Sequence, residues 1–173
     1  ETELNYLPAQ AKKRIAVVGA GPAGLSFATV AAERGHQVTL FDAAQEIGGQ
    51  FNYAKQIPGK EEFHETIRYY TNLLAKHGVE TQLGYAVSSG ELEQSGFDEV
   101  VLATGITPRS LSLPGSGHPK VLSYLDVLRD RKPVGKSVAI IGAGGIGFDV
   151  AEFLLHDGSS TLDVNQWMQE WGV

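Results

Sequence analysis

Short apolar runs that end at glycines alternate with a helical pattern in the first part of the chain. Residues 15–18 are wholly apolar, which is typical of a strand buried on both faces of a parallel sheet. Pro22 suits the first turn of a helix, and small residues follow it as far as Gly35. A second apolar run, 38–41, ends at Asp42. These patterns predict a strand, a helix and a second strand, which together make a parallel βαβ unit.

The middle of the chain changes to an amphipathic helix followed by an alternating strand. Residues 61–77 place apolar side chains at helical spacing, and residues 79–87 alternate apolar and polar positions. Residues 99–103 predict another buried strand. Proline and glycine are frequent in residues 106–120, which predicts a loop.

The last part of the chain begins to repeat the first. Residues 123–131 predict a short helix, 137–141 a strand that runs into glycines, and 148–156 and 165–171 two further helices. The fold class is therefore α/β. We predict a Rossmann-like dinucleotide-binding fold with a parallel sheet, plus the truncated start of a second nucleotide-binding domain.

The strongest motif is a G-x-G-x-x-G string between the first predicted strand and its helix. Gly19 allows a tight turn, Gly21 lets a pyrophosphate approach the backbone, and Gly24 lets the helix pack on the strand. Pro22 and Ala23 open the helix, whose free N–H groups attract phosphate. The alternative is a tight turn without a ligand.

An acidic residue stands where such a fold places its ribose ligand. Asp42 ends the second strand, close to the position about 20 residues after the glycines that this role requires. Beyond it, Gly49 permits a close approach of the chain to a ligand, and Gln50 offers a hydrogen-bonding amide.

Three further places are candidates for cofactor contacts. Lys60 precedes a helix, where an anionic ligand would favour it, although a solvated surface lysine explains it equally well. Thr104 and Gly105 follow a strand at the sheet edge where ligands bind. Gly142, Gly144 and Gly147 form a second G-x-G-x-x-G between a predicted strand and a helix, which indicates a second nucleotide or a turn that binds nothing in this chain.

Composition narrows the chemistry. The net charge of −6 argues against nucleic acid as a partner. Without cysteine, the chain has no redox disulfide, thiol nucleophile or cysteine-ligated cluster, so a bound organic cofactor has to carry any electrons. No apolar run reaches the roughly 18 residues of a membrane span, and we expect a cytoplasmic protein. The histidines have no metal spacing, and no residue pair has the pattern of a catalytic acid and base.

Several strings together resemble one family. They are GAGPAGLSFA, VTLFDA, EIGGQFNYAKQIPGKEEF, VVLATGITPR, KVLSYLDVLRD and VGKSVAIIGAGGIGFD, which lie within residues 19–149. The sequence resembles the bacterial NADPH-dependent 2,4-dienoyl-CoA reductases, in the wider group of trimethylamine dehydrogenase-like flavoproteins. The resemblance covers about residues 1–155.

The resemblance implies a three-part parent protein. An N-terminal barrel would hold FMN and an iron–sulfur cluster, an FAD domain would follow, and an NADPH domain would be inserted in it. On this basis residues 1–13 are a linker from a missing N-terminal region. Residues 14–120 are an incomplete FAD-binding domain, and residues 121–173 are the truncated start of an NAD(P)H-binding domain.

The resemblance also implies site residues and a function. FAD contacts would come from the first glycine turn with Ala23, and from Asp42, Gln50, Lys60 and Val87, the last through its backbone. Electrons would pass from NADPH through FAD towards the cluster and FMN in the barrel. The alternatives are a module that holds ADP structurally, a disulfide reductase of the thioredoxin reductase type, against which the missing cysteines argue, and a methyltransferase, against which the two glycine motifs argue.

Overall fold

The computed structural model describes residues 5–109, 111–156 and 158–173, which fold as two compact units. Unit 1 comprises Glu1–Phe51 and His64–Thr107, and unit 2 comprises Asn52–Phe63 and Pro108–Val173. Residues 1–4 of the predicted linker and residue 110 of the predicted loop lie outside the described residues. Residues 52–63 thus belong to the second compact unit, and the predicted domain bounds of 14–120 and 121–173 stay a prediction.

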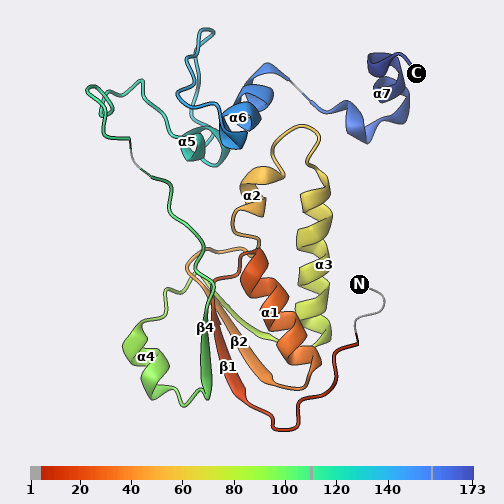
Figure 1. Cartoon of the computed structure of the whole chain (residues 1–173), viewed down its shortest axis with the longest axis vertical. Helices are drawn as coiled ribbons and strands as arrows, with labels where there is room; N and C mark the ends of the chain where they lie inside the picture. Colours follow the sequence, from red (N-terminus) through yellow and green to blue (C-terminus); the bar gives the residue numbers. More distant parts are fainter. Residues whose placement is uncertain (1–4, 110, 157) are drawn as a thin grey trace. The chain divides into compact units, whose positions relative to one another are not determined.

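A four-stranded parallel sheet forms the centre of unit 1 (Figure 1). Its strand order is β3-β2-β1-β4, and every neighbouring pair is parallel. The strands are β1 (Arg14–Val18), β2 (Gln37–Asp42), β3 (Glu80–Leu83) and β4 (Glu99–Leu102). The structure confirms the predicted Rossmann-like α/β fold with a parallel sheet.

Two helices cover one face of this sheet. They are α1 (Pro22–Glu33) and α3 (Glu62–Lys76), while the short α2 (Phe51–Ala54) lies between β2 and α3 in the chain. The core under them joins strand residues to helix residues, namely Ile15, Val17, Val38 and Leu40 with Leu25, Ala28, Ala31 and Leu74. Burial of these apolar side chains fixes α1 above β1 and β2, and thereby sets the turn that joins β1 to α1.

The strand predicted over residues 79–87 is shorter than expected. β3 ends at Leu83 because Gly84 adopts a positive φ of 69°, which turns the chain out of the extended conformation. Ser88 then caps α4 (Ser89–Gln94), a short helix that the sequence analysis did not predict. The capping box of Ser88 and Glu91 is its sequence signal.

Unit 2 has a small core of its own. Its elements after residue 107 are α5 (Tyr124–Leu128), α6 (Gly145–Leu155), the 3₁₀ turn η1 (Ser160–Leu162) and α7 (Val164–Trp171). Ile57 lies between Leu128 of α5 and Val150 of α6, and each of the three is at least nine-tenths buried. The segment 52–63 therefore packs with elements that follow it by more than 60 residues in the chain.

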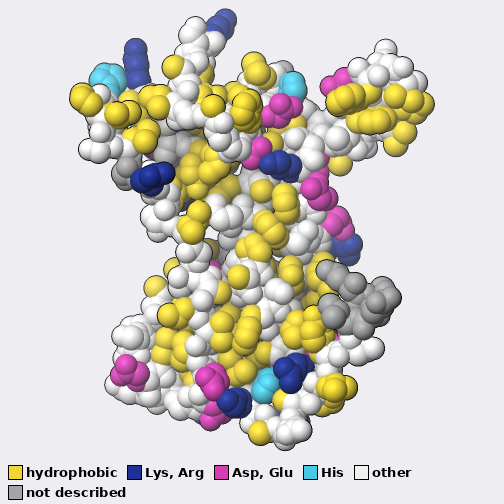
Figure 2. All heavy atoms as spheres, in the orientation of Figure 1, with side chains coloured by type: hydrophobic (Ala, Val, Ile, Leu, Met, Phe, Trp, Pro, Cys, Tyr) yellow, Lys and Arg dark blue, Asp and Glu magenta, His cyan; other side chains and the backbone are white. Residues whose placement is uncertain are grey.

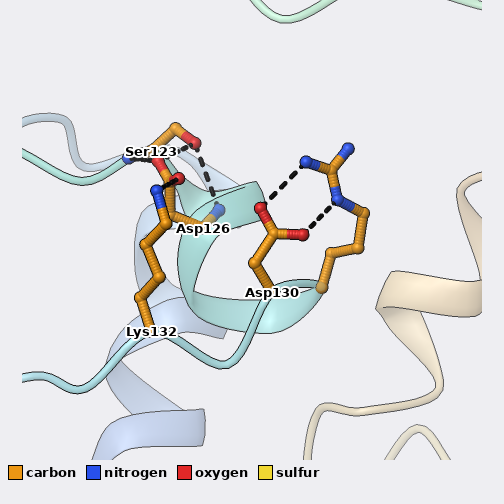
Figure 3. Close-up of polar contacts among 5 residues, drawn as sticks. Ser123, Asp126, Asp130 and Lys132 are labelled. Carbon is orange, nitrogen blue, oxygen red and sulfur yellow. Dashed lines mark hydrogen bonds and ion pairs between the residues drawn. The ribbon is translucent and has the colours of Figure 1, made fainter.

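A network of polar and charged groups stabilises the start of α5 (Figure 3). The Ser123 hydroxyl accepts from the Asp126 N–H, and the Asp126 carboxylate accepts from the Ser123 N–H at 2.7 Å, which makes a capping box. Lys132 forms an ion pair with the same carboxylate. Hydrogen bonds from Lys132 and then from Ser123 hold the pKa of Asp126 well below its ordinary value.

The strand predicted over residues 137–141 does not form. Among the described residues every paired strand lies in unit 1, so this segment has no neighbour with which to exchange backbone hydrogen bonds. Val138, Ile140 and Ile141 are correspondingly exposed. The prediction was wrong because an apolar pattern indicates a strand only where a partner strand exists.

The last helix presents an apolar surface to solvent. Figure 2 shows hydrophobic side chains gathered over α7, to which Val164, Trp167, Met168 and Trp171 contribute. The helix is too short to cross a bilayer, and none of the helices in the described ranges is long and apolar enough to do so.

Candidate functional site

In the turn between β1 and α1, two of the three glycines lie against backbone atoms of the protein. Gly19 has a φ of 111°, and a Cβ on it would overlap the carbonyl group of Ala103, which follows β4. A Cβ on Gly24 would overlap the carbonyl oxygen of Gly19. Both glycines are therefore required by packing of the protein on itself.

Gly21, the middle glycine of the motif, is not required by contacts within the protein. Gly21 is the N-cap of α1 with an ordinary extended backbone, and a Cβ on it would meet no heavy atom of the described residues within 4 Å. No described side chain caps the helix, and the first bond inside it runs from the Leu25 N–H to the Gly21 carbonyl at 2.9 Å. The N–H groups of Ala23 and Gly24 therefore precede the intrahelical bonds and face the start of the helix.

Asp42 lies directly against this turn. One oxygen of its carboxylate accepts the Ala20 N–H at 2.6 Å, and the other accepts the Ala44 N–H at 2.7 Å. β2 places it there because β2 pairs with β1 in parallel register, so that both strands end at the same edge of the sheet. The carboxylate is partly exposed and can still accept hydrogen bonds from a diol.

A second glycine pair closes over the turn. The Gly48 N–H donates to the Ala20 carbonyl at 2.8 Å. A Cβ on Gly49 would stand 2.9 Å from the Gly21 Cα, so a side chain at Gly49 would displace the turn. Gln50 follows and is exposed. The structure thus brings together the first glycine turn, Asp42 and Gly49, and their contacts with a cofactor stay a prediction.

Backbone groups of two residues in this site were missed by the sequence analysis. Ala20 donates to Asp42 and accepts from Gly48, and it is fully buried. Ala103 donates to Val18 at 2.8 Å and abuts Gly19. The only feature of the sequence that points to these two residues is their small size, beside a glycine for Ala20 and after a strand for Ala103. Thr104 and Gly105 follow Ala103 and are both exposed beyond β4.

Val87 lies just after β3, partly buried, and precedes the cap of α4. Next to it, the Glu91 carboxylate accepts hydrogen bonds from the Ser88 hydroxyl at 2.6 Å, from the Tyr85 hydroxyl and from the Ser88 N–H. These bonds, that from the Ser88 hydroxyl first, lower the pKa of Glu91 from 4.5 to about 2.

This capping carboxylate predicts a pH dependence of stability. The folded state binds the proton of Glu91 less tightly than the unfolded chain, so the cap contributes fully above about pH 4.5 and is lost as the pH falls towards 2. We expect Glu91→Gln to flatten the dependence of the unfolding midpoint on pH between 4.5 and 2, by a small amount because the side chain is exposed. Thermal melts of both proteins across this range test it, and parallel curves would contradict it.

The second glycine motif repeats the backbone of the first within unit 2. Gly142 has a φ of 118°, Gly144 is the extended N-cap of α6, and a Cβ on Gly147 would overlap the Gly142 carbonyl oxygen. In contrast to Gly19, a Cβ on Gly142 would meet nothing within 4 Å among the described residues. This turn conformation therefore forms without a neighbour equivalent to Ala103 in the part of the chain that the structure describes.

Lys60 belongs to unit 2, whereas the first glycine turn belongs to unit 1. Its ammonium forms an ion pair of 2.7 Å with the Asp149 carboxylate of α6, and both side chains are partly buried. The FAD contact that the sequence predicted for Lys60 stays a prediction.

The chain is similar to known proteins along most of its length. A profile of the pyridine nucleotide-disulphide oxidoreductases matches residues 13–165. The chain is 39% identical to a cinnamate reductase of Clostridium sporogenes over 95% of its own length and 24% of that protein. It is 32% identical to a bilirubin reductase of Mediterraneibacter gnavus, over 98% of its length and 26% of that protein.

A solved structure is also similar in three dimensions. The complex of 2-naphthoyl-CoA reductase with 2-naphthoyl-CoA shares 33% identity and a TM-score of 0.82, over 87% of this chain and 23% of that one. The chain thus spans about a quarter of the length of these relatives. Since the matched profile covers most of its length, the chain is a dinucleotide-binding α/β region that belongs to the pyridine nucleotide-disulphide oxidoreductase family.

Proposed function

We propose that this chain is the FAD- and NADPH-binding electron-transfer segment of a flavin-dependent reductase of the 2,4-dienoyl-CoA reductase kind. The observation that carries the proposal is the open position at Gly21. The turn around it is closed by protein atoms, whereas Gly21 faces free space next to the uncapped start of α1. This is where an anionic pyrophosphate fits.

The residues of unit 1 suit the ADP half of FAD. The N–H groups of Ala23 and Gly24 would bind the pyrophosphate, and Asp42 would accept from the ribose hydroxyls. The other predicted contacts with FAD would come from Gly49, Gln50, Val87 and the Thr104–Gly105 pair. When bound, FAD supplies a group that accepts a hydride from a nicotinamide and releases electrons singly.

The second glycine turn would hold the nicotinamide cofactor. Gly142, Gly144 and Gly147 have the conformation of the first turn, which supports the same pyrophosphate chemistry. The names of the relatives support the reductive direction, since cinnamate reductase and 2-naphthoyl-CoA reductase are both named as reductases of unsaturated acids or their CoA esters. FMN and an iron–sulfur cluster belong, in this proposal, to an N-terminal barrel of a longer parent chain.

A structural ADP is the competing assignment. ADP would occupy the same first turn but would carry no electrons. The binding site therefore does not distinguish ADP from FAD, whereas the absorbance spectrum does. A flavin absorbance band beyond that of FMN in a parent protein containing these residues would exclude it.

Titration of the chain by calorimetry tests the proposal. We expect ADP and FAD to bind with affinities within about tenfold of each other, because the predicted contacts are to the ADP half that both share. Nicotinamide mononucleotide, which lacks that half, is the control and is expected not to bind at the first turn. If neither ADP nor FAD binds, the assignment of the first turn is wrong.

A further inference from the structure

Lys60 and Asp149 form an ion pair within unit 2. The ion pair joins the segment 52–63 to α6, the helix that begins at this turn. Ile57, Leu128 and Val150 pack beside it, and the Gly59 N–H donates to the Ser159 hydroxyl at 3.2 Å. The backbone around Lys60 is therefore held in place from several sides within unit 2.

Asp149 lies one helical turn from the start of α6. The helix begins at Gly145, and residues four apart lie on the same face, about 6 Å apart along the helix axis. An unpaired carboxylate at this position would repel a pyrophosphate bound to the N–H groups at the start of α6, because like charges repel over such a distance. The ammonium of Lys60, 2.7 Å away, cancels this charge.

The first glycine turn has no such carboxylate. When Gly142 is aligned with Gly19 and Gly147 with Gly24, Asp149 aligns with Ser26 of α1. Neither α1 nor α6 has an acidic residue in its first turn, and the contrast lies one turn further along, where Ser26 of α1 is neutral and Asp149 of α6 is acidic. Only the second of the two turns has an acid at this depth, and it is also the one with a paired lysine.

We propose that Lys60 is a positioning residue that masks the charge of Asp149 and thereby keeps the second turn receptive to an anionic dinucleotide. Lys60 acts through Asp149 and not by contact with the nucleotide. The role rests on the proposed function of the second turn as the nicotinamide-cofactor site. It differs from the predicted role of Lys60 as an FAD ligand.

Three variants separate these roles. They are Lys60→Met, Asp149→Asn and the double variant. Each is made in a parent protein that carries Gly21→Asp, so that NADPH cannot bind at the first turn and only binding at the second turn is measured. We expect Lys60→Met to weaken NADPH binding about fivefold, as suits one partly exposed charge. Asp149→Asn should bind NADPH at least as well as the parent, and the double variant should recover parental affinity. In 0.5 M salt the fivefold loss should shrink below about twofold.

The asymmetry between the single variants is decisive, because both break the same ion pair. Equal losses in the two would indicate that the pair only holds the fold, and would overturn the masking role. A loss in Lys60→Met that Asp149→Asn does not rescue would also overturn it. If the parent itself fails to bind NADPH, the assignment of the second turn is wrong and the masking role falls with it. FAD titration of Lys60→Met with Gly21 restored tests the FAD-ligand role, which predicts weaker FAD binding whatever stands at 149.

Discussion

Replacement of Gly24 by alanine is expected to destabilise unit 1 by about 3 kcal/mol or more. The new Cβ would overlap the carbonyl oxygen of Gly19, and this neighbour is backbone that cannot rotate away. α1 would have to move off β1, and the core around Leu25 and Val17 would open with it. Urea unfolding followed by circular dichroism measures the loss.

Gly21→Ala is the matched control, since it makes the same change in the same turn. Its Cβ would meet no described atom within 4 Å, so we expect a loss of no more than about 1 kcal/mol, from the poorer helix cap. Equal unfolding midpoints for Gly24→Ala and Gly21→Ala would show that the close approach of α1 to Gly19 is not rigid.

Replacement of Gly21 by aspartate is expected to abolish nucleotide binding and leave the fold intact. The carboxylate would cap α1 by accepting the N–H groups of Ala23 or Gly24, and it would lie favourably at the positive end of the helix. Stability should therefore be unchanged or higher by up to about 1 kcal/mol. The same N–H groups would no longer be available to a pyrophosphate, and the charge would repel it. We expect ADP affinity to fall more than about a hundredfold.

Gly144→Asp places the same side chain at the start of the other helix, α6. It should leave ADP binding at the first turn unchanged and weaken NADPH binding, as measured by calorimetry. Retention of ADP affinity by Gly21→Asp would mean that the open space at Gly21 is not the pyrophosphate position.

The parts of the fold that could be predicted are those whose pattern depends on short-range rules. The buried run of β1, Pro22 at the start of α1 and Asp42 at the end of β2 all lie where expected. The glycine turn was predictable for the same reason, because its backbone requires glycine at Gly19 and Gly24.

The rest depends on contacts between distant residues, which one sequence does not display. Residues 137–141 have the pattern of a strand but no partner to pair with. The segment 52–63 joins unit 2 through Ile57 and Lys60, whose partners Val150 and Asp149 are about 90 residues away in the chain. Ala20 contributes to the site only through backbone groups, which any small residue provides.

The placement of residues 52–63 affects how the protein folds during synthesis. Lys60 leaves the ribosome 89 residues before Asp149, a delay on the order of ten seconds at cellular rates. Unit 1 can complete its sheet within that time, since β4 ends at Leu102. Ile57 has its apolar partners only once α5 and α6 have been made, so until then the nascent chain exposes a hydrophobic loop to which chaperones can bind.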